Sequence, residues 1–308
     1  MPFFSVIIPV YNKQKFVFKT IQSVLNQSYI DIEIIVINDG STDESENEIL
    51  KCNDNRIKYY SQTNNGVATT RNEGIKKATG EYICFLDADD FWKSEFLKTF
   101  KYYIDLNVNQ KVFSCSIEFE TSKKVVTPTY SIQRTNNFEI VNFFKASCNE
   151  SVLWTSSSVF EKSVFETVGV FDTNLKMGED TDLWIRIGLQ YSIFFIWEKL
   201  AIYCFDQNSI SRNLNYKLEE ITFKKHEISE KTNTDLKKHL DLNRFSIAIK
   251  SKILGNKKEY NKYKNEISSS SLVLKKRVLL QLPSFILIGL IKLKTVTTNL
   301  GLGSSVFR

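Results

Sequence analysis

In the stretch ICFLDADDFW (83–92), an apolar run is followed by three carboxylates within four positions. Residues 83–86 are typical of a buried strand, and Asp87, Asp89 and Asp90 come directly after it. Like charges this close repel one another, and a strand end that only has to reach water needs a single Asp or Asn. The crowded carboxylates at this strand end therefore need an explanation beyond solubility.

Strand and helix patterns alternate through the first ninety residues, up to this stretch. The predicted buried strands are 3–10, 32–37, 56–60 and 82–86. The predicted helices are 13–28, 42–51 and 66–78. This alternation predicts an α/β fold with a mostly parallel, Rossmann-like sheet flanked by helices. Ligands bind beyond the carboxyl ends of such strands, so the residues after each strand should converge on one cleft.

The rest of the chain is less regular. In the mixed segment 110–216, the predicted strands are 111–120, 123–130, 156–160, 193–196 and 201–205. The predicted helices of this segment are 138–146 and 179–190. From 216 onward the sequence becomes rich in Lys and Glu and helical in pattern. We therefore expect a catalytic domain over 1–215 and a basic helical region over 216–308.

Composition and charge narrow the class of protein. The 308 residues are 42% hydrophobic and 25% charged, as in ordinary globular proteins. Five cysteines are spread singly, which predicts reduced core residues of a cytoplasmic protein and no disulfide or zinc framework. His226 and His239 are expected to be surface helix residues without a ligand role. Residues 217–308 carry a net charge of +11 and residues 1–216 one of −5, which suggests an anionic partner for the C-terminal region.

The C-terminal region contains an apolar run at 278–291. Its fourteen residues are too few to span a membrane. Five basic residues flank it: Lys275, Lys276, Arg277, Lys292 and Lys294. We therefore expect 275–294 to lie on an anionic membrane surface, with packing on the protein itself or on a second copy as the alternatives. No signal peptide is recognisable after Met1, so we expect a cytoplasmic protein at the inner face of the membrane.

Four blocks of sequence resemble the family 2 glycosyltransferases, which have the GT-A fold. The blocks are VIIPVYNK (6–13), VINDGSTDES (36–45), NNGVATTRNEGIKKATGEYICFLDADD (64–90) and GVFDTNLKMGEDTDLWIRI (169–187). Their order and spacing match over about residues 3–212, and the C-terminal third has no comparable motif. The resemblance implies an inverting enzyme of the bacterial surface-polysaccharide type. The QxxRW motif of processive members is absent from the sequence, which favours transfer of a single sugar.

The resemblance gives the crowded carboxylates a chemical purpose. A nucleotide sugar leaves behind a diphosphate, and a divalent cation can neutralise the charge that develops on it. Mn²⁺ or Mg²⁺ accepts one or two carboxylates together with phosphates and water. Asp87 and Asp89 share one side of an extended segment, and by the resemblance Asp87 contacts the ribose or a metal-bound water while Asp89 binds the metal. We expect Asp90 to be the N-cap of the next helix and Asp43 to cap the helix after the second strand.

The remaining site residues follow from the same resemblance. Asp39 would accept the N3–H of uracil, which implies a UDP-sugar, and Pro9 and Tyr11 would line the base pocket. Tyr11 could stack on the base or pack in the core. Arg71 is expected to point toward the nucleotide, where its guanidinium can pair with Asp or phosphate. Arg212, in NSISRN (208–213), is expected to approach the diphosphate.

The second acidic motif is GEDTDLW (178–184). By the resemblance, Asp180 is the base that takes the proton from the acceptor hydroxyl. The alternative is that Glu179, Asp180 and Asp182 only favour the positive end of a helix dipole. Trp154 and Trp184 would be an acceptor wall or core residues.

The leading hypothesis is thus a metal-dependent transferase that moves one sugar to a saccharide or lipid-linked glycan. The main alternative is an inactive relative that binds a nucleotide sugar or serves as a scaffold in a membrane complex. A nucleotidyltransferase is disfavoured because PVYNKQKF (9–16) contains no glycine. Nucleic-acid binding is not expected, because the basic region has no recognisable module with interleaved aromatics.

Overall fold

The computed structural model describes residues 1–120, 125–204 and 223–299, with residues 294–299 described by backbone alone. The chain divides into two compact units. One contains Met1–Pro128, Ile132–Phe143 and the described residues from Ser151 to Cys204. The other contains Thr129–Ser131, Phe144–Glu150 and the described residues from Phe223 onward. The predicted boundary between 215 and 216 lies outside the described residues.

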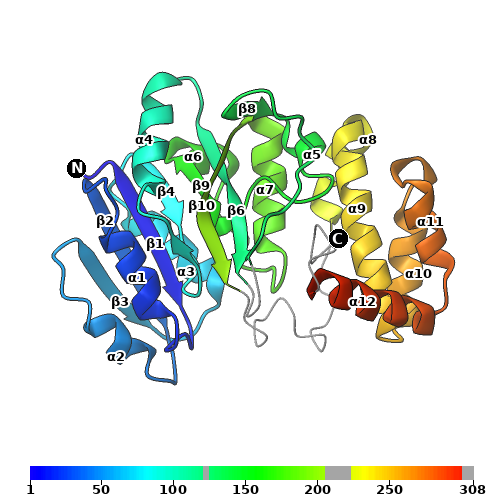
Figure 1. The fold of residues 1–308 in the computed structure, drawn as a ribbon, viewed down its shortest axis with the longest axis horizontal. Coiled ribbons are helices and arrows are strands. Elements are labelled where there is room, and N and C mark those ends of the chain that lie inside the picture. Colours follow the sequence, from blue (N-terminus) through cyan, green and yellow to red (C-terminus); the bar gives the residue numbers. More distant parts are fainter. Residues whose placement is uncertain (121–124, 205–222, 300–308) are drawn as a thin grey trace. The chain divides into compact units, whose positions relative to one another are not determined.

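The first unit begins with four parallel strands in the order β3-β2-β1-β4 (Figure 1). They are β1 (Phe4–Val10), β2 (Ile32–Asp39), β3 (Ile57–Gln62) and β4 (Tyr82–Phe85). Every residue of β1, β2 and β4 is buried, as expected for strands covered on both faces. The connecting helices are α1 (Val17–Leu25), α2 (Ser45–Leu50) and α3 (Val67–Lys77). The predicted alternation is confirmed, and the carboxyl ends of these strands share one edge of the sheet.

The other half of the sheet is mixed. The described residues form one sheet of ten strands, which continues from β4 in the order β9-β6-β10-β5. The added strands are β5 (Phe91–Trp92), β6 (Val112–Glu120), β7 (Val125–Val126), β8 (Phe138–Val141), β9 (Ser158–Glu161) and β10 (Ile193–Cys204). Of their pairings only β6 with β10 is parallel, and the pairings of β9, β5, β7 and β8 are antiparallel. The expected parallel sheet thus describes the first half better than the second.

Several predicted elements of the middle segment differ in the structure. Residues 138–146 were expected to be helical, but they form β8 followed by the short helix α5 (Phe143–Ala146). The ring of Phe138 stacks on Phe194 of β10 at 4.5 Å, so pairing with the sheet overrides the helical pattern. The two strands predicted at 193–196 and 201–205 are one bulged strand, β10, whose register shifts on both sides of Lys199.

Helices and aromatic side chains complete the core of this unit. The helices are α4 (Phe96–Leu106), η1 (Thr155–Ser157), α6 (Ser163–Val168) and α7 (Glu179–Gln190). α7 has the bounds that the sequence predicts. Its Trp184 is buried and stacks on Phe160 of β9 at 5.4 Å, so it is a core residue and not part of an acceptor wall.

The second unit is helical in its described residues. It contains η4 (Lys224–His226), α8 (Glu227–Thr232), α9 (Thr234–Ile253), α10 (Lys257–Glu266), η5 (Ser269–Ser271), α11 (Leu274–Gln281) and α12 (Ser284–Asn299). The buried Arg244 of α9 pairs with Glu230 through two bonds, at 2.6 and 2.8 Å, and with Asp241 at 3.0 Å. His226 and His239 are buried, so the prediction that they lie on the surface is wrong. His239 packs on the ring of Phe144, because α9 buries this face.

Candidate functional site

Asp87 and Asp89 lie just beyond β4, and each is paired with a different cation. The Nη2 of Arg71 donates to Asp87 Oδ1 at 2.7 Å, and the Nζ of Lys13 donates to Asp89 Oδ2 at 2.5 Å. Both carboxylates remain accessible, with side-chain exposures of 30% for Asp87 and 17% for Asp89. Burial raises the pKa of Asp89, and the ammonium of Lys13 opposes that shift. Two separate cations therefore relieve the repulsion between these carboxylates.

Asp90 has a structural role that differs from the predicted one. It is buried, and α4 starts only at Phe96, so Asp90 does not cap the next helix. Its carboxylate accepts hydrogen bonds from Ser156 Oγ at 2.6 Å and from the backbone N–H of Cys204 at 3.1 Å. Burial, together with the charges of Asp89 and Asp87, raises the pKa of Asp90 well above its usual value. The prediction failed because tertiary contacts with η1 and β10 hold this side chain in the core.

Arg71 of α3 connects the two acidic motifs. Its guanidinium is buried and bridges Asp87 on one side to Glu179 Oε1 on the other, at 3.0 Å. The guanidinium also lies over the ring of Phe171, 5.2 Å from its centroid. Glu179, at the start of α7, is 108 residues from Arg71 in the sequence. The acidic motif after β4 and the start of α7 are therefore parts of one site. Arg71 thus pairs with an Asp, and its predicted orientation toward a nucleotide stays a prediction.

The three carboxylates at the start of α7 have different surroundings. Asp182 is buried and pairs with Arg186 one turn later, at 2.8 Å, so it stabilises the helix. Burial raises the pKa of Glu179, and the charge of Asp180 adds to the shift. Asp180 Oδ1 accepts from the backbone N–H of Thr181 at 2.6 Å, and no described Lys or Arg forms an ion pair with Asp180. Of the three, Asp180 is the carboxylate that has no ion pair with a described Lys or Arg.

Asp39 is buried at the end of β2 and holds the loop that leads into α3. Its Oδ1 accepts from Gln62 Nε2 at 2.7 Å and from the N–H of Asn65 at 3.0 Å, and its Oδ2 accepts from the N–H of Gly66 at 2.9 Å. A carboxylate offers about four acceptor positions, so one on Oδ2 remains for a further donor. Recognition of a base edge by Asp39 stays a prediction.

The loop after β1 presents one exposed aromatic ring. Pro9 is buried within β1, whereas Tyr11 is 42% exposed. This exposure excludes core packing for Tyr11, and stacking on a base stays a prediction. Asp43 accepts from the N–H of Ser45, the first residue of α2, although the N-cap position itself is Glu44. Arg212 lies outside the described residues.

The described residues do not form a metal cage by themselves. No group of three or more His, Cys, Asp or Glu side chains in that part of the chain could hold a metal ion. Asp87 and Asp89 nevertheless supply the oxygen ligands that Mn²⁺ and Mg²⁺ prefer. These residues fit such an ion only when phosphates and water complete its coordination.

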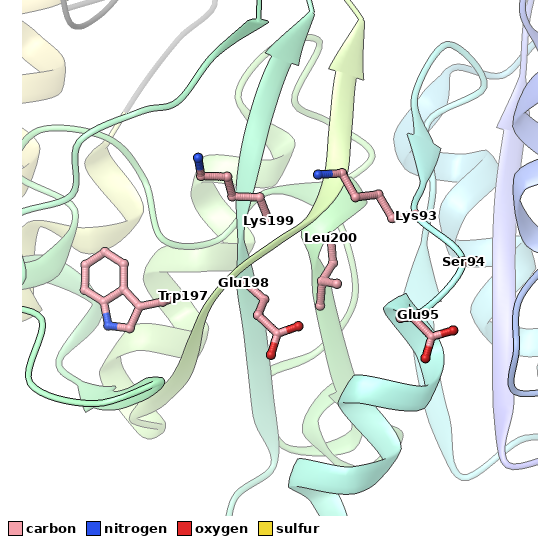
Figure 2. Close-up of a pocket in the computed structure, with 7 residues that line it drawn as sticks. All are labelled: Lys93, Ser94, Glu95, Trp197, Glu198, Lys199 and Leu200. Atoms are coloured by element: carbon pink, nitrogen blue, oxygen red, sulfur yellow. The ribbon is translucent and has the colours of Figure 1, made fainter.

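A surface hollow of about 560 Å³ lies elsewhere in the first unit (Figure 2). It is formed by the bulge of β10 and the segment between β5 and α4, and its lining is Lys93, Ser94, Glu95, Trp197, Glu198, Lys199 and Leu200. None of the predicted site residues lines it. The converging carboxylates, and not this hollow, define the candidate site.

Two site residues were missed from the sequence. Lys13 stands on a loop with other polar residues, and Ser156 stands in a run of three serines. Neither position has a periodicity or spacing that distinguishes it. Their roles depend on contacts with Asp89 and Asp90, which only the folded sheet creates.

Comparison with known families agrees with this architecture. The family described as Glycosyl transferase family 2 matches residues 5–169, more than half of the chain. The chain therefore belongs to glycosyl transferase family 2.

Individual relatives carry names of the same kind. The GalNAc(5)-diNAcBac-PP-undecaprenol beta-1,3-glucosyltransferase of Campylobacter jejuni is 31% identical over 216 residues, which are 68% of each protein. An uncharacterized glycosyltransferase of Rickettsia bellii is 36% identical over 192 residues, 59% of this chain and 26% of that protein. Matches to the five rickettsial relatives span from about a quarter to just under two thirds of those proteins.

Solved structures show the fold. S. aureus TarS 1-349 in complex with UDP-GlcNAc has a TM-score of 0.62 at 21% identity, over 87% of this chain and 70% of that one. The same protein in complex with UDP has a TM-score of 0.59 at 20% identity, over 94% and 78%. The predicted α/β fold of the GT-A type, with a helical C-terminal region, is confirmed.

Proposed function

We propose that this protein is a metal-dependent, inverting glycosyltransferase that moves a single sugar from a UDP-sugar to a saccharide or lipid-linked glycan. The observation that carries the proposal is the bridge from Asp87 through Arg71 to Glu179. It joins the carboxylates that would face the donor diphosphate to the helix that carries the candidate base. Donor and acceptor chemistry would then occur in one site.

On the donor side, the chain's own residues bind and orient the nucleotide. Mn²⁺ or Mg²⁺, when bound at Asp89, would neutralise the charge of the diphosphate leaving group. Asp87 would hold the ribose or a metal-bound water. Asp39 would accept the N3–H of uracil at its remaining acceptor position, and Tyr11 would stack on the base. Pro9 would support the base pocket from within β1, and Arg212 would contact the diphosphate.

On the acceptor side, Asp180 would act as the general base. Its carboxylate would remove the proton of the acceptor hydroxyl as that oxygen attacks the anomeric carbon, opposite the diphosphate. The stereochemistry at that carbon would thereby invert. Glu179 does not compete for this role, because Arg71 already holds its carboxylate.

The relatives support a choice of substrates. The TarS structures contain UDP-GlcNAc and UDP, which supports a UDP-linked donor. The name of the Campylobacter jejuni relative describes an undecaprenol-linked acceptor, which supports a lipid-linked glycan and a role in cell-surface polysaccharide synthesis. We further propose that 1–215 is the catalytic domain and 216–308 its basic helical extension.

Helices α11 and α12 support contact with a membrane surface. In the described residues, no helix has the length and apolar character needed to cross a bilayer. The exposed apolar side chains are Leu274, Val278, Phe285, Ile286, Ile288, Leu290, Ile291 and Leu293. Three basic residues, 275–277, lie among them in the sequence, and Lys292 lies near the far end. Apolar side chains beside cations fit the inner face of a cytoplasmic membrane that is rich in anionic lipid.

Vesicle sedimentation tests this contact. The protein should sediment with vesicles that contain phosphatidylglycerol and stay in solution with phosphatidylcholine alone. A variant with Phe285→Ser and Ile288→Ser should lose binding. Binding that ignores lipid charge would contradict recognition of anionic lipid. A stable dimer in analytical ultracentrifugation that the same variant dissociates would instead identify a second copy of the chain as the partner.

A donor screen tests the enzymatic proposal. The purified protein is incubated with Mn²⁺ and a panel of UDP-, GDP- and dTDP-sugars, and release of the nucleoside diphosphate is measured. We expect release from a UDP-sugar, abolished by EDTA and in Asp89→Ala. Thermal stabilisation by a donor without turnover, even after a lipid-linked acceptor is added, would favour the inactive binding protein.

A further inference from the structure

The ammonium of Lys13 forms an ion pair with Asp89, the carboxylate that the proposed function assigns to a metal. We propose that Lys13 is a built-in counter-ion, which pairs with Asp89 while no donor is bound and moves to the donor diphosphate when a divalent cation takes Asp89. The inference rests on the proposed function and adds to it a reason for the cation and the donor to bind together.

The geometry of the ion pair places Lys13 in direct competition with a metal for Asp89 Oδ2. Lys13 Nζ lies 2.5 Å from Asp89 Oδ2, and the two side chains are only 22% and 17% exposed. A divalent cation cannot use this oxygen while an ammonium remains there, because like charges at such separations repel strongly in a partly buried site. Cation binding at Asp89 therefore requires Lys13 to leave.

The backbone of Lys13 is fixed, although its side chain is long. The N–H of Lys13 donates to Ser45 Oγ at 2.7 Å, and the N–H of Thr42 donates to Asn12 Oδ1 at 2.8 Å. The N–H of Glu44 donates to Gln14 Oε1, also at 2.8 Å. These bonds tie the loop after β1 to the loop after β2. Movement of the charge is thus confined to the flexible stem of one lysine.

The incoming donor provides a new partner for the displaced ammonium. A diphosphate carries several negatively charged oxygens, and Lys binds such groups as a compact point charge. When a cation replaces Lys13 at Asp89 and Lys13 pairs with the phosphates, every charge in the site keeps a partner. A cation at Asp89 and a diphosphate at Lys13 each require the ion pair between Lys13 and Asp89 to separate, so cation and donor should bind cooperatively.

The alternative is that Lys13 only stabilises the loop through Asp89. Removal of its charge would then lower the stability of the protein and leave UDP affinity in EDTA unchanged. Lys13→Met keeps the length and apolar stem of the side chain but removes the ammonium. Lys15→Met is a matched control, because Lys15 is exposed on the same loop and no ion pair is seen for it in the described residues.

Binding of Mn²⁺ to the full-length protein, followed by electron paramagnetic resonance, tests the inference. Without donor, Lys13→Met should bind Mn²⁺ about tenfold more tightly than the unmodified protein, and Lys15→Met should bind like the unmodified protein. With EDTA present, titration calorimetry should show weaker UDP binding by Lys13→Met, because the diphosphate has lost a cation. In Lys13→Arg, the affinities for Mn²⁺ and for UDP should lie between those of Lys13→Met and the unmodified protein. Lys13→Arg also serves as the second variant if Lys13→Met fails to fold.

The outcomes separate this inference from the proposed function. Equal Mn²⁺ affinity of Lys13→Met and the unmodified protein, when both bind Mn²⁺ with UDP, would overturn the role of Lys13 alone. No Mn²⁺ binding by any variant, with or without UDP, would overturn the metal site together with this inference. Tighter Mn²⁺ binding by Lys13→Met that Asp89→Asn abolishes would support both.

Discussion

The buried Glu33 and the half-buried Asp89 are carboxylates at opposite ends of the parallel part of the sheet. Glu33, near the start of β2, accepts from Lys58 Nζ at 2.5 Å, from Ser5 Oγ at 2.6 Å and from the N–H of Thr79 at 2.6 Å. Burial by itself would raise the pKa of Glu33, but these hydrogen bonds lower it to about 2. Asp89, beyond the end of β4, has a raised pKa, mainly through burial.

The two pKa shifts differ in direction because the two carboxylates differ in how many hydrogen-bond donors surround them. The charge of Glu33 is matched by several donors from β1, β3 and the segment before β4, so ionisation of Glu33 stabilises the fold. At the carboxyl ends of the strands, Asp89 and Asp180 keep oxygen atoms with fewer partners. Such groups stabilise the protein less, but they can accept a ligand or a proton. We call the end of the sheet that contains Glu33 the structural end, and the end near Asp89 and Asp180 the chemical end.

Asp180→Asn should produce the largest effect on the chemical end. Without a base, turnover should fall about 10³-fold, while the melting temperature stays near that of the unmodified protein. Asp182→Asn is the matched control on the same helix turn, because its carboxylate pairs with Arg186. Its expected effect is lower stability with turnover retained. Equal losses of turnover in the two variants would favour the alternative that these carboxylates only stabilise the helix start.

Arg71→Met should affect both properties, because the bridge connects two carboxylates in a buried place. Turnover should fall about 10²-fold, since Asp87 and Glu179 lose the cation that orients them. Stability should fall by about 3 kcal/mol, as for other buried pairs that lose one partner. Arg71→Lys should recover little, because one ammonium cannot reproduce the fork of a guanidinium. Steady-state kinetics and urea unfolding measure the two effects, and full recovery by Lys would contradict a bridging role.

Glu33→Gln should change stability alone. The pKa of about 2, compared with 4.5 for an ordinary Glu, corresponds to roughly 3 kcal/mol of stability at neutral pH. Because the folded pKa is the lower one, this stability is present above pH 4.5 and is lost as the pH falls toward 2. Urea unfolding across this range should show a flatter acid limb for Glu33→Gln. Donor turnover by Glu33→Gln at neutral pH should be unchanged at a temperature where the variant is folded, whereas Asp180→Asn should lose turnover.

The sequence predicted the structural elements better than their contacts. Apolar periodicity depends on neighbouring residues, so the four parallel strands and the bounds of α7 could be predicted. The partners of Asp90 and Arg71 are 66 and 108 residues distant, and no local pattern encodes them. Residues 138–146 were misjudged for the same reason, since their strand exists only through pairing with β10.

Lys58→Met should produce the smallest effect, and it sharpens the comparison of the two ends. The side chain of Lys58 is 44% exposed, and Ser5 and Thr79 remain as donors to Glu33 when it is removed. The expected loss is below about 1 kcal/mol and should shrink further in salt. Urea unfolding at low and high salt measures it. A loss as large as that of Glu33→Gln would mean that one charge, and not the number of hydrogen bonds, satisfies Glu33, and the two ends of the sheet would then differ only in the identity of their cations.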